Sequence, residues 1–155
     1  MDKPANRRQL WAFIGAYLGV WLPHRAFTPG HSTPLDFVAD GFFDPRVDVA
    51  AWAYRSGIKT LGASVLAALE FFFHPGAPGL QARVLAGSEA QAGVLYEYWT
   101  RWCGTLLADR VRRGPTRRLT ELDTGRMEIL ATQKVLRDGY WFLDILKCEL
   151  KPKYR

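Results

Sequence analysis

The middle of the chain alternates between short apolar stretches and segments of helix length, and this alternation limits the fold more than any other feature. Residues 46–54 and 81–87 are apolar and short enough to be buried strands. Residues 61–73 and 89–103 follow them and are predicted to be helices. Strands that alternate with helices form parallel sheets covered by helices. We therefore expect an α/β fold with a parallel sheet.

Local signals set the expected ends of the other elements. Residues 9–22 are predicted to form a helix that the following proline ends. Thr33 is predicted to cap a second helix, which has Pro34 at its first position and runs to residue 43. Ser88, with a glutamine three residues later, forms the pattern of a capping box before the helix at residues 89–103.

The later part of the chain is predicted to return to strands. Residues 123–125 carry an Asp-Thr-Gly turn signal between residues 117–122 and 126–132, which predicts a β-hairpin. Residues 134–139 are predicted to be a loop. The apolar residues 140–150 are predicted to be a buried strand, with a helix as the alternative.

The chain is basic, with a net charge of +6 over 155 residues. Such a charge favours polyanions such as nucleic acid, nucleotide or anionic lipid, and the alternative is a surface that is merely soluble. Hydrophobic residues make up 48% and charged residues 23%, which excludes a disordered chain. The basic residues cluster, and a contact with the backbone of double-stranded DNA needs only such charges. The cluster consists of Arg110, Arg112, Arg113, Arg117 and Arg118.

Cysteine and hydropathy patterns limit the compartment. Cys103 and Cys148 have neither the spacing of a metal site nor that of a disulfide framework, so we expect a reduced, cytoplasmic compartment. The apolar residues 11–22 are too few to span a bilayer as a helix. We interpret them as a buried or partner-facing helix and expect no membrane partner. The alternative is a signal peptide or membrane anchor.

A segment that ends at Thr60 corresponds to the phosphate-binding pattern G-x-x-x-x-G-K-[ST] between a strand and a helix. Ala53 and Ile58 stand where the two glycines are expected, and a β-branched residue before the lysine resists the tight backbone around phosphates. The alternative is an ordinary strand–helix turn with an exposed lysine. If the pattern is functional, ATP is bound with Mg²⁺, Thr60 is the metal ligand, and the cofactor-binding residues are Arg55, Ser56, Gly57, Ile58, Lys59 and Thr60.

Four segments in order resemble the N-terminal ATPase region of phage terminase large subunits, over roughly residues 25–139. They are HSTPLDFVADGFF, AWAYRSGIKTLGASVLAALEFFF, ARVLAGSEAQAGVLYEYW and GRMEILATQKVLRDG. The matching features are an H-x-x-P motif, an arginine before G-x-K-T, a strand that ends in Gly-Ser before a helix, and a hairpin followed by Leu-Ala-x-Gln.

The resemblance implies an incomplete P-loop NTPase of the ASCE type, with a three-layer parallel sheet and a β-hairpin. It implies one partial domain over residues 1–155, with an N-terminal helical segment at 1–45 and a nucleotide-binding core at 46–155. The implied activity is ATP-driven packaging of double-stranded DNA in the host cytoplasm, from a phage or prophage. The implied partners are terminase or portal subunits and further copies of the chain. Arg55 would contact phosphates, or else be a solvated or helix-capping charge.

The sequence departs from the family in its acidic motif, where an apolar strand should end in Asp-Glu. Here Glu149 is the one acid at the expected place, with Cys148 before it, so Glu149 is the candidate catalytic residue and the alternative is a simple surface charge. The family's nuclease domain does not follow, so we expect a truncated protein that is not a nuclease. The incomplete acidic motif and Ile58 both oppose turnover of ATP, so we expect weak or no hydrolysis. The competing hypotheses are another P-loop enzyme and a non-enzymatic basic module that binds DNA or protein.

Overall fold

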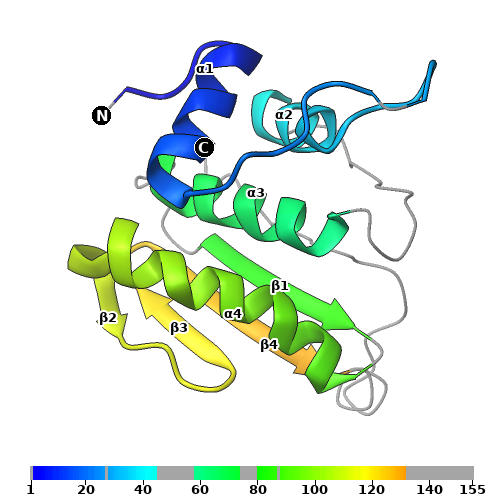
Figure 1. Cartoon of the computed structure of the whole chain (residues 1–155). Coiled ribbons are helices and arrows are strands. Elements are labelled where there is room, and N and C mark those ends of the chain that lie inside the picture. The colour runs from blue at the N-terminus through cyan, green and yellow to red at the C-terminus, as the bar shows by residue number, and fades with distance from the viewer. Residues whose placement is uncertain (1, 27, 45–57, 74–79, 87, 132–155) are drawn as a thin grey trace, which may run out of the picture. The chain divides into compact units, whose positions relative to one another are not determined.

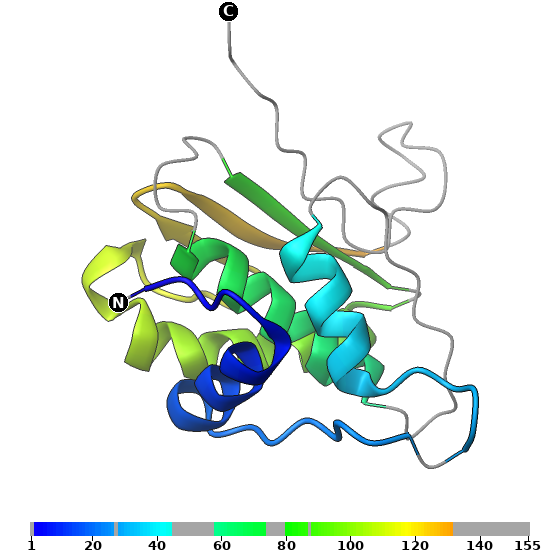
Figure 2. The same cartoon turned by 90° about the horizontal axis from the view of Figure 1, so that it is seen from above.

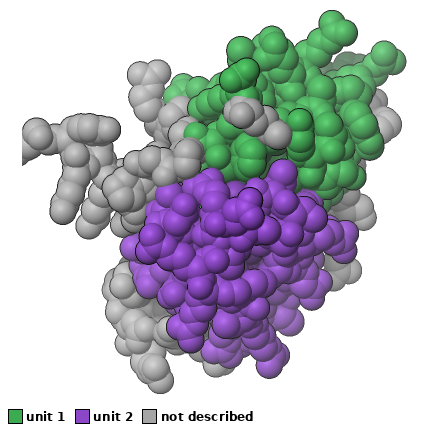
Figure 3. All heavy atoms as spheres, turned by 90° about the vertical axis from the view of Figure 1, so that its left-hand side faces the viewer, with its two compact units in different colours: residues 1–73 green, residues 74–155 purple. Residues whose placement is uncertain are grey.

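The structure is a computed structural model that describes residues 2–26, 28–44, 58–73, 80–86 and 88–131. The chain forms two compact units, residues 1–73 and residues 74–155 (Figure 3). The strand predicted at residues 46–54, the boundary between residues 45 and 46, the loop at 134–139 and the segment at 140–150 all lie outside the described residues.

The first unit contains helices α1 (Arg7–Phe13), η1 (Ile14–Leu18), α2 (Pro34–Phe43) and α3 (Lys59–Phe73), drawn in blue to green in Figure 1. Asn6 caps α1, because its side chain accepts a hydrogen bond from the Gln9 amide at 3.0 Å. η1 is a π-helical turn that continues α1 directly.

The helix predicted at residues 9–22 is wrong at both ends, since it begins at Arg7 and ends at Leu18. Gly19 ends it by taking a left-handed backbone with φ of 67°, a conformation that glycine adopts without steric cost. The chain then folds back, and the indole nitrogen of Trp11 donates a hydrogen bond to the carbonyl oxygen of Leu22 at 2.8 Å.

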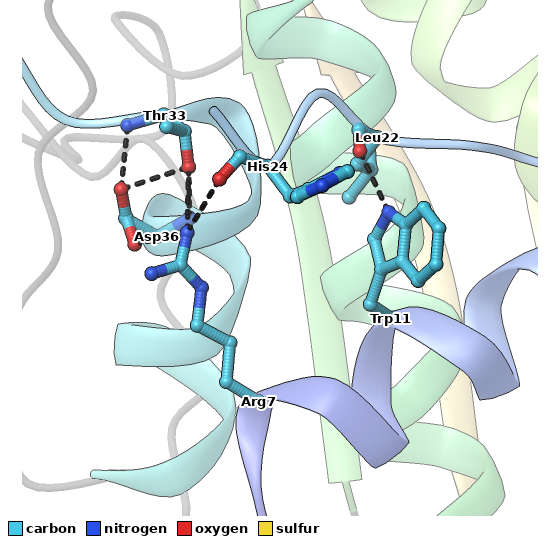
Figure 4. A network of polar contacts seen from close by, with 6 residues as sticks. All are labelled: Arg7, Trp11, Leu22, His24, Thr33 and Asp36. Carbon is cyan, nitrogen blue, oxygen red and sulfur yellow. Dashed lines mark hydrogen bonds and ion pairs between the residues drawn. The ribbon is translucent and has the colours of Figure 1, made fainter. Parts of the chain in front are cut away.

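A polar network joins the start of α1 to the start of α2 (Figure 4). Thr33 caps α2 as predicted, and Asp36 completes a capping box: the Thr33 amide donates to the Asp36 carboxylate at 2.6 Å, and the Asp36 amide donates to the Thr33 hydroxyl at 3.1 Å. The guanidinium of Arg7 lies 2.7 Å from the Asp36 carboxylate and donates to the Thr33 hydroxyl at 3.1 Å. The network therefore fixes α2 against α1.

These contacts make the charge of Asp36 part of the unit's stability. Burial alone would raise the pKa of Asp36, but hydrogen bonds from the Thr33 amide and hydroxyl, together with the charge of Arg7, outweigh burial and lower it. A carboxylate whose pKa is lower in the folded state stabilises the fold above its unfolded-state pKa. That contribution is lost as the pH falls through the folded-state pKa.

We expect Asp36→Ala to lower the free energy of unfolding by about 1–2 kcal/mol at pH 7, through the lost cap and ion pair. The difference from the unaltered protein should shrink as the pH falls below about 4. Urea unfolding at several pH values measures it. Asp40→Ala, at an exposed position of the same helix, is the control. A difference for Asp36→Ala that stays constant down to low pH would contradict this role of the carboxylate.

The core of the first unit lies between α2 and α3, with α1 beside them (Figure 2). α3 is buried along most of its length, as its apolar sequence predicts. Gly41 of α2 allows the close approach of α3, because a Cβ atom there would lie 2.6 Å from the Leu66 side chain. Aromatic rings also pack at the ends of α1 and α3, where the ring centroids of Phe13 and Phe73 are 4.9 Å apart.

The second unit contains strand β1 (Leu80–Ala86), helix α4 (Glu89–Leu106), turn η2 (Ala108–Arg110) and three further strands. The further strands are β2 (Val111–Arg113), β3 (Leu119–Leu122) and β4 (Gly125–Ala131), and the sheet order is β1-β4-β3-β2. β1 pairs with β4 in parallel, whereas β3 is antiparallel to both β4 and β2. The strand predicted at residues 81–87, the Ser88 cap and the hairpin are confirmed.

The expected fold class is confirmed as α/β, but the described sheet is mixed rather than parallel. The reason lies in the connections: α4 separates β1 from β2 along the chain, whereas β2, β3 and β4 follow one another through short turns, and strands joined by short turns run antiparallel. β2 was not predicted as a strand at all. Within the residues that the structure describes, none of the helices combines the length and the apolar character needed to cross a bilayer.

α4 covers one face of this sheet across β1 and β4 (Figure 1). The residues of α4 that face the sheet recur every three or four positions, as in any amphipathic helix. The Tyr96 hydroxyl lies 2.7 Å from the Thr120 hydroxyl in a buried hydrogen bond that ties α4 to β3. The buried side chains of this face are Ala92, Leu95, Tyr96, Trp99, Trp102 and Cys103.

Candidate functional site

The start of α3 has an unusual backbone. Ile58, directly before the helix, has φ of 59°, and no other non-glycine residue among those described has a positive φ. Its carbonyl oxygen accepts a hydrogen bond from the Gly62 amide at 2.8 Å, which begins the helix. The left-handed region costs a residue with a side chain about 1–2 kcal/mol. A β-branched residue therefore holds a conformation that glycine would adopt easily.

Lys59 and Thr60 occupy the first turn of α3, so the helix begins two residues before the predicted start at residue 61. Lys59 is partly exposed and Thr60 is exposed. The Thr60 carbonyl oxygen accepts a hydrogen bond from the buried Ser64 hydroxyl at 2.7 Å, so this turn is firmly part of the helix. The amides of a first helical turn point toward the helix start, where they favour anions.

The described part of the predicted site consists of Ile58, Lys59 and Thr60, which are consecutive in the chain. Arg55, Ser56, Gly57 and the candidate catalytic residue Glu149 lie outside the described residues. Of the H-x-x-P motif, His31 is exposed in the turn before α2, and Pro34 opens that helix.

The described residues contain neither a cluster of metal-binding side chains nor a reactive thiol. No group of three or more His, Cys, Asp or Glu side chains there could hold a metal ion. Burial raises the pKa of the Cys103 thiol to about 12, so this cysteine stays protonated at neutral pH and is no nucleophile.

A second cluster gathers charged side chains in the other unit. Of the five arginines singled out by the sequence, Arg110 lies in η2, is only partly exposed and pairs with Asp123 at 3.4 Å. The other four lie on β2 and on the turn that follows it and are exposed: Arg112, Arg113, Arg117 and Arg118. The strand β2 was not predicted from the sequence. Neither was the role of Glu89, whose carboxylate binds the guanidinium of Arg118 in this turn. The adjacent glycine and proline at positions 114–115 signal the turn. No local sequence pattern, however, predicts a contact between Glu89 and Arg118, which are 29 positions apart.

No family model matches the chain, and no curated protein or solved structure matches it with significant similarity.

Proposed function

We propose that the chain is the ATP-binding motor region of a viral DNA-packaging terminase large subunit, and that Ile58, Lys59 and Thr60 belong to its phosphate-binding loop. The observation that carries the proposal is the left-handed backbone of Ile58 directly before Lys59. The P-loop pattern places a glycine at this position. Glycine is the residue used where the backbone must take such a conformation close to a ligand.

The side chains that follow suit the same ligand. Lys59 is the first residue of α3, and in this proposal its ammonium binds the β- and γ-phosphates, where the helix dipole adds to its charge. The exposed Thr60 hydroxyl is the oxygen ligand through which the loop would hold Mg²⁺, and the bound ion would neutralise charge on the phosphates. The Ile58 side chain crowds this position, so we propose weak hydrolysis or none.

The kinds of element found in three of the similar segments also support the proposal. In the described residues these are the helix α3, the strand β1 followed by α4 with its Ser88 cap, and the β3–β4 hairpin.

Titration with a fluorescent ATP analogue and Mg²⁺ tests the proposal. We expect Lys59→Ala to weaken binding by about tenfold to a hundredfold, since a hydrogen bond to a charged group contributes about 1.5–3 kcal/mol. Lys3→Ala removes the same charge from the same unit and should leave the affinity unchanged. Equal affinities for the Lys59 and Lys3 variants would refute the nucleotide site.

Two substitutions of Ile58 distinguish the effect of its left-handed backbone from the effect of its side chain. Ile58→Gly and Ile58→Ala both remove the crowding side chain, but only glycine relieves the left-handed backbone. The glycine variant should bind the analogue more tightly and be more stable than the alanine variant by about 1 kcal/mol. The usual order inside a helix, in which alanine is the more stable, would contradict the geometry proposed for this position.

A further inference from the structure

The hairpin formed by β2 and β3 carries a concentrated positive charge. Residues 111–118 contain four arginines and no acidic residue. All four side chains are exposed, and β2 lies at the edge of the sheet (Figure 1). The charge is therefore available to a partner in solution.

The backbone under these arginines is well supported. In the turn, the Thr116 hydroxyl accepts hydrogen bonds from the amides of Arg118 and Leu119, and the Thr116 amide donates to the Leu119 carbonyl oxygen at 2.9 Å. At the base of the hairpin, the Asp123 amide donates to the Arg110 carbonyl oxygen at 2.9 Å. The arginines thus project from a fixed loop, which lowers the ordering cost of binding.

One of the arginines already holds an anion of its own chain. The Arg118 guanidinium binds the Glu89 carboxylate through two atoms, Nε at 2.9 Å and an Nη nitrogen at 2.5 Å. Arg117 lies 3.7 Å from the same carboxylate and is 90% exposed. Hydrogen bonding to Arg118, together with the charges of both arginines, lowers the pKa of Glu89 against the opposing effect of burial. The two-atom fork that grips this carboxylate fits two oxygens of a phosphate equally well.

We propose that residues 111–118 bind the phosphate backbone of a nucleic acid, and that Glu89 is an internal counter-ion which a phosphate displaces from Arg118. Glu89 lowers the affinity of the free hairpin for anions and is released when a stronger polyanion arrives. The proposal uses only residues of the second unit, so it stands or falls independently of the nucleotide site at α3.

A nucleic acid fits this surface better than an acidic protein. Protein interfaces rely on a buried core of apolar and aromatic side chains. Among the described residues, the large apolar side chains that are exposed all lie outside 111–118. Purely ionic contact with a repeating phosphate chain needs no such core.

Fluorescence anisotropy of a labelled DNA duplex, titrated with the full chain at several salt concentrations, tests the proposal. For Arg112→Gln/Arg113→Gln/Arg117→Gln, we expect weaker binding and a slope of log affinity against log salt reduced by about 2.7, or roughly 0.9 for each phosphate contact. Arg101→Gln changes an exposed arginine of α4 and should leave the slope nearly unchanged. A triple variant with the slope of the Arg101 variant would overturn the assigned surface.

A matched pair of variants, Glu89→Gln and Glu97→Gln, tests the role of Glu89. Glu89→Gln should tighten DNA binding severalfold, because Arg118 is freed for a phosphate. Glu97→Gln removes the same charge from an exposed site on α4 and should have a smaller effect. Equal effects of the two variants would overturn the counter-ion role. Competition by polyglutamate as effective as by unlabelled DNA would overturn the assignment to a nucleic acid. Circular dichroism of each variant confirms that the fold is retained.

Discussion

Gly125→Ala is expected to lower the free energy of unfolding by about 3 kcal/mol or more, at the upper end of overpacking effects. Gly125 begins β4 and lies opposite Leu80 in the parallel pair with β1. A Cβ atom on Gly125 would lie 1.9 Å from the Leu80 carbonyl oxygen and 2.8 Å from its carbonyl carbon. Because both atoms belong to the backbone, no side-chain rotation relieves the overlap, and the two strands must shift apart.

Thermal unfolding followed by circular dichroism measures this effect. A loss of 3 kcal/mol corresponds to a fall in melting temperature of roughly 6–12 °C for a chain of this size. Gly93→Ala is the matched control, because a Cβ atom there meets nothing within 4 Å and the position lies inside α4. It should raise stability by up to about 1 kcal/mol. Equal melting temperatures for the two variants would show that β1 and β4 do not approach as closely as described.

Features set by neighbouring residues could be predicted from the sequence. Thr33 with Pro34, and Ser88 before α4, are correctly predicted caps because a helix start depends on a few adjacent side chains. The β3–β4 hairpin is also correctly predicted, because its turn residues lie between the two strands they join.

The early end of η1 was not predicted although its cause is local. Gly19 takes a left-handed backbone there, but the apolar pattern continues to residue 22.

Features set by distant residues could not be predicted. β2 is short and polar, and it becomes a strand only because β3 supplies its hydrogen-bond partners.

The candidate site was predicted only in part, because some of its features depend on adjacent residues and others on distant ones. The sequence places Lys59 and Thr60 next to a helix start, and the structure agrees. It also indicated that Ile58 would resist a glycine-like backbone, yet Ile58 has φ of 59°. Such a conformation is imposed by the structure around the residue and not by its own preference. The ion pair of Glu89 with Arg118 joins residues 29 positions apart, which no local pattern reveals.

Trp99→Ala is expected to lower the free energy of unfolding by about 3–5 kcal/mol, the range found when a large buried aromatic side chain is removed. Trp99 is 0% exposed and lies on the face of α4 that covers the sheet. Its removal takes apolar area out of the core and leaves a cavity, because packed neighbours relax only in part. Trp99→Phe keeps a ring in the same place and should cost clearly less.

Trp21→Ala provides the matched control, since it is the same substitution at a tryptophan that is 62% exposed. We expect it to cost about 1 kcal/mol or less, in line with the loss of a ring contact with Trp11. Urea unfolding gives both values, and hydrogen exchange of the α4 and β4 amides locates the Trp99 effect in the second unit. If both alanine variants cost the same, the burial of Trp99 is not what stabilises α4 on the sheet. A large loss of stability for Trp99→Ala alone would show that the face of α4 packed against the sheet stabilises the second unit.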